Sequence, residues 1–253
     1  MNKAFCKKDF WFSLILTGCL ILFNVSCGLD IFYVIDEPYN TEHIPEVDST
    51  DYTDSYFEFW TVDKGYDGVT FLGTEVYYKI YRSSSALNSQ VNILNNLAGS
   101  SETSSSAASR LIESYHYQPL RGQSLDGKMY EDVSVLIPSV KRNQKVYIRL
   151  SDYTDIDTYL ARIKVDGENI YGDSSLVIPV RKITSHPDPS FNFANISSDY
   201  LPKDDDVDVN KDGTVEEGVL YVSLYAVAVA QDNTYSPVYS NILYLGAVQI
   251  PLK

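Results

Sequence analysis

Two stretches near the C-terminus constrain the fold more than any other part of the sequence. Residues 218–230 (GVLYVSLYAVAVA) alternate, so that one face carries Leu220, Val222, Leu224, Ala226 and Ala228. The turn QDNTYSPV separates this stretch from residues 240–250 (SNILYLGAVQI). A period of two residues places successive side chains on opposite faces of a strand, and both stretches are therefore predicted strands. We expect a mainly β protein that ends in this pair of strands.

A second pair of strands is predicted earlier in the chain. Residues 55–62 (SYFEFWTV) and 73–85 (GTEVYYKIYRSSS) are rich in aromatic side chains and are separated by a Gly/Asp turn region. Together with the C-terminal pair, these segments resemble strands B, C, F and G of fibronectin type III domains. The resemblance implies an immunoglobulin-like β-sandwich with Trp60 in the core between the two sheets. The chain departs from the family's pattern at the corner tyrosine, which falls near Leu220, one place away from Tyr221.

The chain is longer than one such sandwich, which needs about 100 residues, and we expect an insertion at about residues 84–183. Helical spacing predicts two short helices in its first part, joined by a serine-rich loop, with apolar positions at Leu87, Val91, Leu94 and Leu97 and then at Ala108, Leu111, Ile112 and Tyr115. Strands follow at 133–138, 145–150, 159–165 and 175–183, with a hairpin turn at Asp166-Gly167. The alternative is that some of these strands form a second small β-domain.

The N-terminus has the pattern of a secretory signal. Residues 1–26 contain three Lys before residue 9 and then an apolar run at 10–25, which is shorter than the ~20 residues of a membrane-spanning helix. All three cysteines, Cys6, Cys19 and Cys27, lie in the first 27 residues, so the exported domain cannot form a disulfide framework.

The sequence NVSCG around Cys27 resembles the lipobox of bacterial lipoproteins, whose cysteine receives diacylglycerol. Cys19, in LTGC, is the alternative lipidation site, and an ordinary signal peptide or an uncleaved inner-membrane anchor is the alternative to lipidation. The resemblance implies a palmitate-bearing membrane anchor, sorted to the outer membrane because Gly28, and not Asp, follows Cys27.

Charge and composition narrow the function. Residues 27–52 are acidic and are predicted to be a tether between the anchor and a folded domain at 53–253. The formal charge of −14 argues against nucleic acid as a partner. Three His without metal-ligand spacing and no catalytic motif predict a non-catalytic binding or structural module, and 21 Tyr suit a protein or glycan ligand.

The sharpest motif is DVNKDGTVEEG at 208–218, which resembles the calcium loops of EF-hand and dockerin proteins. Its oxygen ligands for Ca²⁺ would be Asp208, Asn210, Asp212, Thr214 and Glu216, with Glu217, Asp204 or Asp206 completing the shell. The loop departs from the pattern at its twelfth position, which is Val219 instead of Glu. A solvated acidic turn is the alternative. An envelope enzyme or solute-binding protein that uses these acidic-loop residues with calcium is the alternative function.

Overall fold

The computed structural model describes residues 33–49, 51–124, 127, 135–152, 159–171, 176–182, 188–193, 206–208 and 218–252. These residues belong to one unit, Val34–Lys253, apart from Tyr33. They form antiparallel sheets and two α-helices, so the prediction of a mainly β protein is confirmed. In the described part of the chain, none of the helices has the length and apolar character needed to cross a membrane.

The strands and helices have the following bounds along the chain. The bounds of the strands are β1 Tyr39–His43, β2 Phe57–Trp60, β3 Thr70–Tyr81, β4 Gln118–Pro119, β5 Arg121–Ser124, β6 Ile137–Pro138, β7 Lys145–Arg149, β8 Arg162–Val165, β9 Glu168–Asn169, β10 Val177–Val180, β11 Val207–Asp208, β12 Val219–Gln231 and β13 Pro237–Pro251. The bounds of the helices are η1 Tyr52–Asp54, α2 Ser84–Gly99, α3 Ser104–Ser109 and the π-helical turn η2 Arg110–Ser114.

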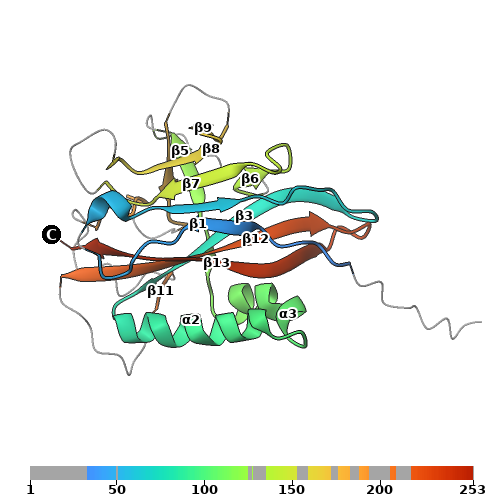
Figure 1. Cartoon of the computed structure of the whole chain (residues 1–253), viewed down its shortest axis with the longest axis horizontal. Helices are drawn as coiled ribbons and strands as arrows, with labels where there is room; N and C mark the ends of the chain where they lie inside the picture. The colour runs from blue at the N-terminus through green and yellow to red at the C-terminus, as the bar shows by residue number, and fades with distance from the viewer. Residues whose placement is uncertain are drawn as a thin grey trace, which may run out of the picture. The chain divides into compact units, whose positions relative to one another are not determined.

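Two sheets make up most of the fold. The outer sheet has the strand order β1-β2-β7-β8-β9. The central sheet has the order β11-β3-β12-β13, with β4 and β6 also paired to β3, and β5 pairs with β10 in a small third sheet. In Figure 1 the long strands of the central sheet lie between the outer sheet and helices α2 and α3. The central sheet is therefore covered on both faces.

The main core lies between the outer and central sheets. β3 contributes Val76, Tyr78 and Ile80, and β2 contributes Phe57 and Phe59, all fully buried in one apolar cluster. The predicted inward face of β12 takes part as expected, with Leu220, Val222, Leu224 and Ala226 in this cluster and Ala228 in a smaller one beside it.

The opposite face of the central sheet packs against the helices. Tyr81 and Tyr225 of this face are fully buried beside Leu87 and Leu94 of α2. α2 begins after Ser83, whose hydroxyl accepts a hydrogen bond from the backbone N–H of Ala86. The predicted pair of helices is confirmed, except that α3 begins inside the serine-rich segment.

The structure corrects two expectations about domain organisation. β1 lies within the predicted tether, residues 27–52, and is paired with β2, so the tether prediction is wrong for residues 39–43. The second correction concerns the insertion predicted at about residues 84–183. β7 lies in this range, yet it pairs with β2 and its side chains Val146 and Ile148 lie in the main core. β7 and β8 are thus part of the same sandwich of sheets, and they do not form a second domain.

Candidate functional site

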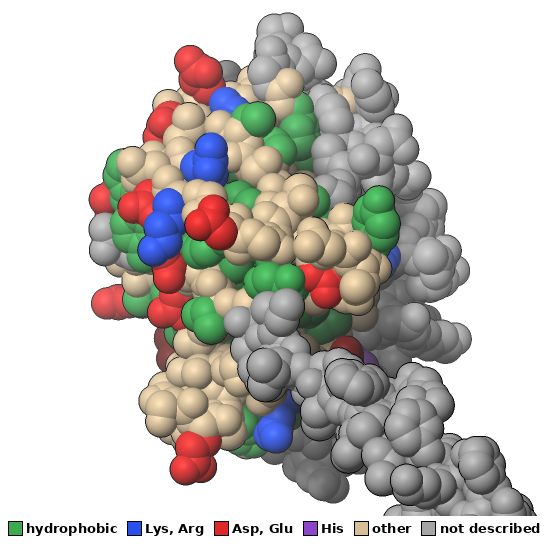
Figure 2. All heavy atoms as spheres, turned by 90° about the vertical axis from the view of Figure 1, so that its right-hand side faces the viewer, with side chains coloured by type: hydrophobic (Ala, Val, Ile, Leu, Met, Phe, Trp, Pro, Cys, Tyr) green, Lys and Arg blue, Asp and Glu red, His purple; other side chains and the backbone are tan. Residues whose placement is uncertain are grey.

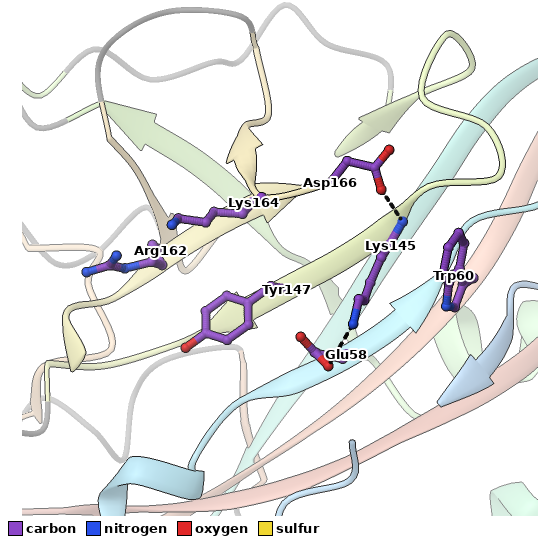
Figure 3. A pocket seen from close by; sticks show the side chains of 8 residues that line it. Glu58, Trp60, Lys145, Tyr147, Arg162, Lys164 and Asp166 are labelled. Carbon is purple, nitrogen blue, oxygen red and sulfur yellow. Dashed lines mark hydrogen bonds and ion pairs between the residues drawn. The ribbon is translucent and has the colours of Figure 1, made fainter. Parts of the chain in front are cut away.

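A groove lies on the solvent side of the outer sheet. Its volume is ≈ 560 Å³, and it is lined by Glu58, Trp60, Lys145, Tyr147, Arg162, Lys164, Asp166 and Gly167. Figure 3 shows these side chains on the face of β2, β7 and β8. The volume is within the range of about 300–1,000 Å³ that small-ligand sites occupy.

Strand alternation explains why polar and aromatic side chains meet there. In β7, fully buried and half-buried residues alternate. Val146 and Ile148 are fully buried, whereas Lys145 and Tyr147 are half-buried and line the groove. β2 and β8 follow the same alternation of buried and half-buried residues. The apolar half of each strand therefore fixes the outward direction of the other half.

The pairing register brings the lining residues into two cross-strand rows. Trp60 is opposite Lys145 in the first row, while Glu58 is opposite Tyr147 in the second. Tyr147 is in turn opposite Lys164 of β8. Directly opposed side chains have Cβ atoms about 4.5–5.5 Å apart, so each row places its members in contact distance of one another.

A carboxylate of β1 holds the first row in place. One oxygen of Glu42 accepts a hydrogen bond from the indole Nε1 of Trp60 at 2.9 Å, and the other accepts from Lys145 Nζ at 2.7 Å. Lys145 Nζ also lies 3.5 Å from an oxygen of Glu58. The hydrogen bond from Lys145 lowers the pKa of the Glu42 carboxyl, and the same bond raises the pKa of Lys145. Glu42 thus orients both an aromatic and a cationic side chain of the groove.

The turn from β8 to β9 closes one side of the groove. Asp166 and Gly167 have φ angles of 50° and 79°, which is the geometry of a type I′ hairpin turn, and the predicted hairpin is confirmed. A side-chain oxygen of Asp166 accepts the backbone N–H of Lys145 at 3.0 Å. This bond ties the turn to the end of β7.

A stack of aromatic rings runs from Tyr147 of the groove to His43 of β1. The ring of Tyr147 stacks on that of Tyr56 with centroids 5.0 Å apart, and Tyr56 stacks on His43 at 3.9 Å. Arg149 is nearly fully buried and donates to the hydroxyl of Tyr147 at 2.9 Å and to the carbonyl of Tyr52 at 2.6 Å. These contacts give Tyr147 a fixed position, as a rigid binding surface requires.

The two lysines of the groove differ in their ion pairs. Lys145 is held by two carboxylates, whereas Lys164 makes no ion pair with any residue that the structure describes. In Figure 3 the side chains of Arg162 and Lys164 lie at one end of the groove and Trp60 lies at the other. The groove thus offers an aromatic end and a cationic end, with Tyr147 between them.

The structure places Trp60 differently from the expectation. Trp60 is half-buried and lines the groove, so its predicted position in the core between the sheets is wrong. The two residues on either side of Glu58, Phe57 and Phe59, fill the core instead. The sequence already indicates this position, because Trp60 is two residues after the charged Glu58 and therefore lies on the same face of the strand.

Most of the other predicted site residues lie outside the described residues. These are Cys19, Cys27, Asn210, Asp212, Thr214 and Glu216. Asp208 is described, and one of its oxygens lies 3.4 Å from Lys79 Nζ. Within the described segments, no three His, Cys, Asp or Glu side chains are grouped as metal ligands would be. The calcium loop stays a prediction.

Asp206 has a partner other than a metal. Both of its side-chain oxygens accept hydrogen bonds from Arg181, at 2.8 and 2.6 Å, and the hydroxyl of Tyr78 donates to it at 2.7 Å. Asp206 and Arg181 are both fully buried. Asp206 is therefore a core ion-pair residue, and both of its side-chain oxygens are already bound to Arg181.

Comparisons of the chain with protein-family models, with curated proteins and with solved structures give no match.

Proposed function

We propose that this chain is a non-catalytic lipoprotein of the bacterial cell envelope that binds a glycan in the groove of the outer sheet. The observation that carries the proposal is the set of half-buried aromatic side chains, Trp60 and Tyr147, held in fixed positions beside charged groups. Aromatic faces suit the C–H faces of sugar rings, and the charged groups around them suit hydroxyls.

The proposed fold is a fibronectin III-like, immunoglobulin-like sandwich. The order β3-β12-β13 in the central sheet matches the order C-F-G, and β1-β2-β7 in the outer sheet matches A-B-E, when the strands are taken in chain order. The helices α2 and α3 then lie between strands C and E in the chain and cover the outside of the C-F-G sheet.

The position in the envelope rests on the N-terminal sequence. In the proposal, residues 1–26 are removed, Cys27 carries the acyl chains, and the protein is attached to the outer membrane. Metabolic labelling with palmitate tests this. Label that is lost in Cys27→Ala supports the assignment, and label lost only in Cys19→Ala moves the anchor to the alternative site. Absence of label in the wild-type chain overturns the lipid anchor.

Glycan binding is tested on an array of neutral and charged oligosaccharides with the purified protein. We expect Trp60→Ala to weaken any binding at least tenfold, because the indole forms one end of the groove. Tyr235→Ala is the matched control, since Tyr235 is 80% exposed and is not a lining residue of the groove. Equal loss in both variants, or binding unaffected by Trp60→Ala, would place the ligand elsewhere on the protein.

A further inference from the structure

The groove is less acidic than the chain as a whole. The whole sequence has 34 Asp and Glu against 20 Lys and Arg. The lining residues and Glu42, which bonds to two of them, include three Lys or Arg and three Asp or Glu. On the face drawn in Figure 2, acidic and basic side chains are also interspersed among apolar ones. In such a balanced groove, a cation that makes no ion pair is the place where an anionic ligand group would bind.

The arrangement of ion pairs decides which cation is available to a ligand. Lys145 is already balanced by Glu42 and Glu58, at 2.7 and 3.5 Å. Arg149 is buried and its guanidinium nitrogens bond to carbonyls and to a tyrosine hydroxyl. Lys164 is half-buried on the face of the groove and makes no ion pair with the described residues. The ammonium of Lys164 is therefore the group that a ligand anion would meet.

Arg162 strengthens the same end of the groove. It is two residues before Lys164 on β8, on the same face, and its Nε donates to the carbonyl of Leu160 at 3.1 Å. Figure 3 shows the side chains of Arg162 and Lys164 at the same end of the groove. Register adds to this, because Lys164 is directly opposite Tyr147. A ligand whose negative group binds Lys164 would therefore place the rest of the molecule on the ring of Tyr147.

We infer that the ligand of the groove is an acidic oligosaccharide, with one sugar carboxylate against Lys164 and the sugar rings along Tyr147 towards Trp60. This inference rests on the proposed glycan-binding function and names its substrate class. The net charge of −14 repels a densely charged polyanion, so sparse carboxylates on an otherwise neutral chain fit the site better than a nucleic acid does. The hollow shape and its volume of ≈ 560 Å³ favour a short oligosaccharide over the flat contact of a folded protein partner.

The experiment compares matched sugars that differ by a carboxylate. Titration calorimetry is done with 3′-sialyllactose against lactose, and with glucuronic-acid-substituted xylotriose against xylotriose. We expect at least one acidic member to bind tenfold or more tightly than its neutral partner, and the preference to shrink as NaCl is raised from about 0.05 to 0.5 M, because salt screens exposed charges.

Two variants assign the preference to the groove. Lys164→Gln should bring the acidic sugar down to the affinity of the neutral one, while Trp60→Ala should weaken both members of the pair. Lys64→Gln is the control, because Lys64 is exposed, pairs with Asp36 and is not among the lining residues of the groove. The thermal midpoint of each variant is measured to show that it is folded.

The outcomes separate the two proposals. Equal affinity for acidic and neutral sugars, with both lost in Trp60→Ala, keeps the glycan-binding function and overturns the acidic ligand. Binding of neither kind overturns both proposals. Stronger binding of an acidic hexapeptide than of any sugar overturns them in favour of a protein partner. An acidic preference that survives Lys164→Gln overturns the placement of the carboxylate.

Discussion

Glu75 of β3 is expected to make the free energy of unfolding fall as the pH rises. Its side chain is nearly fully buried and faces Arg121, with 3.0 Å between Oε2 and Nη1. The other oxygen accepts backbone N–H groups of Val76 and Leu136, at 3.2 and 3.3 Å. Burial away from water dominates over these favourable contacts and raises the pKa of Glu75 from 4.5 to about 7.

The sign of the effect follows from proton linkage. In the unfolded chain the carboxyl loses its proton near pH 4.5, whereas in the folded protein it keeps the proton until about pH 7. The folded state therefore binds more protons between these values, and its stability falls as the pH rises through this window. With 1.36 kcal/mol for each pKa unit, the contribution of Glu75 to the free energy of unfolding drops by about 2.5 kcal/mol between pH 5 and 8.

Urea unfolding at pH 5, 6, 7 and 8 measures this contribution. Glu75→Gln removes the titrating group and keeps the size of the side chain, so its free energy of unfolding should fall less over the same range, by about 2.5 kcal/mol. Glu102→Gln, which removes an exposed carboxylate, is the control and should follow the wild type. If Glu75→Gln and the wild type lose stability in parallel, the carboxyl does not titrate in this window and the argument from burial is refuted.

Three further predictions concern the core and are measured by urea unfolding of the purified variants. Phe59→Ala should lower the free energy of unfolding by about 3–5 kcal/mol, because the ring is fully buried between the sheets, and a loss below about 1 kcal/mol would contradict this packing. Asp206→Ala should cost about 3–5 kcal/mol because it leaves the fully buried Arg181 without its carboxylate, and a neutral result would show that this ion pair does not form. Gly73→Ala should cost more than about 1 kcal/mol, since Gly73 has a φ of +143° and a Cβ there would collide with the carbonyl oxygen of Ile137, whereas unchanged stability would mean that the backbone adjusts freely.

The elements that the sequence predicts well are those with an uninterrupted period. β12 and β13 are long, and successive side chains of β12 lie in turn in the core between the sheets and in the core beside the helices. α2 presents Leu87, Val91 and Leu94 at helical spacing. β1 was missed because its acidic and polar residues look like a hydrated tether. Its charge is compatible with a strand only because Glu42 meets Trp60 and Lys145 of two other strands.

The groove depends on contacts that are distant in sequence. Strand parity places Glu58 with Trp60, Lys145 with Tyr147 and Arg162 with Lys164, and each of these pairs can be read from its own strand. That β2 lies beside β7, with Trp60 opposite Lys145, involves residues 85 positions apart and is set by the packing of the whole core. Local pattern therefore predicts which side chains face outward, whereas the site itself requires the sheet order.

The central sheet also has a consequence for when the protein can fold. β3 needs β12 as its neighbour along most of its length, and β12 is separated from it by more than a hundred residues of chain. Both the sheet-facing core and the helix-facing core include side chains of β12, so neither can close before residues 219–231 arrive. Contacts of such long sequence separation make folding slow. A chain built in this way stays open until its last strands are available, so the export proposed above would move a chain that has not yet folded.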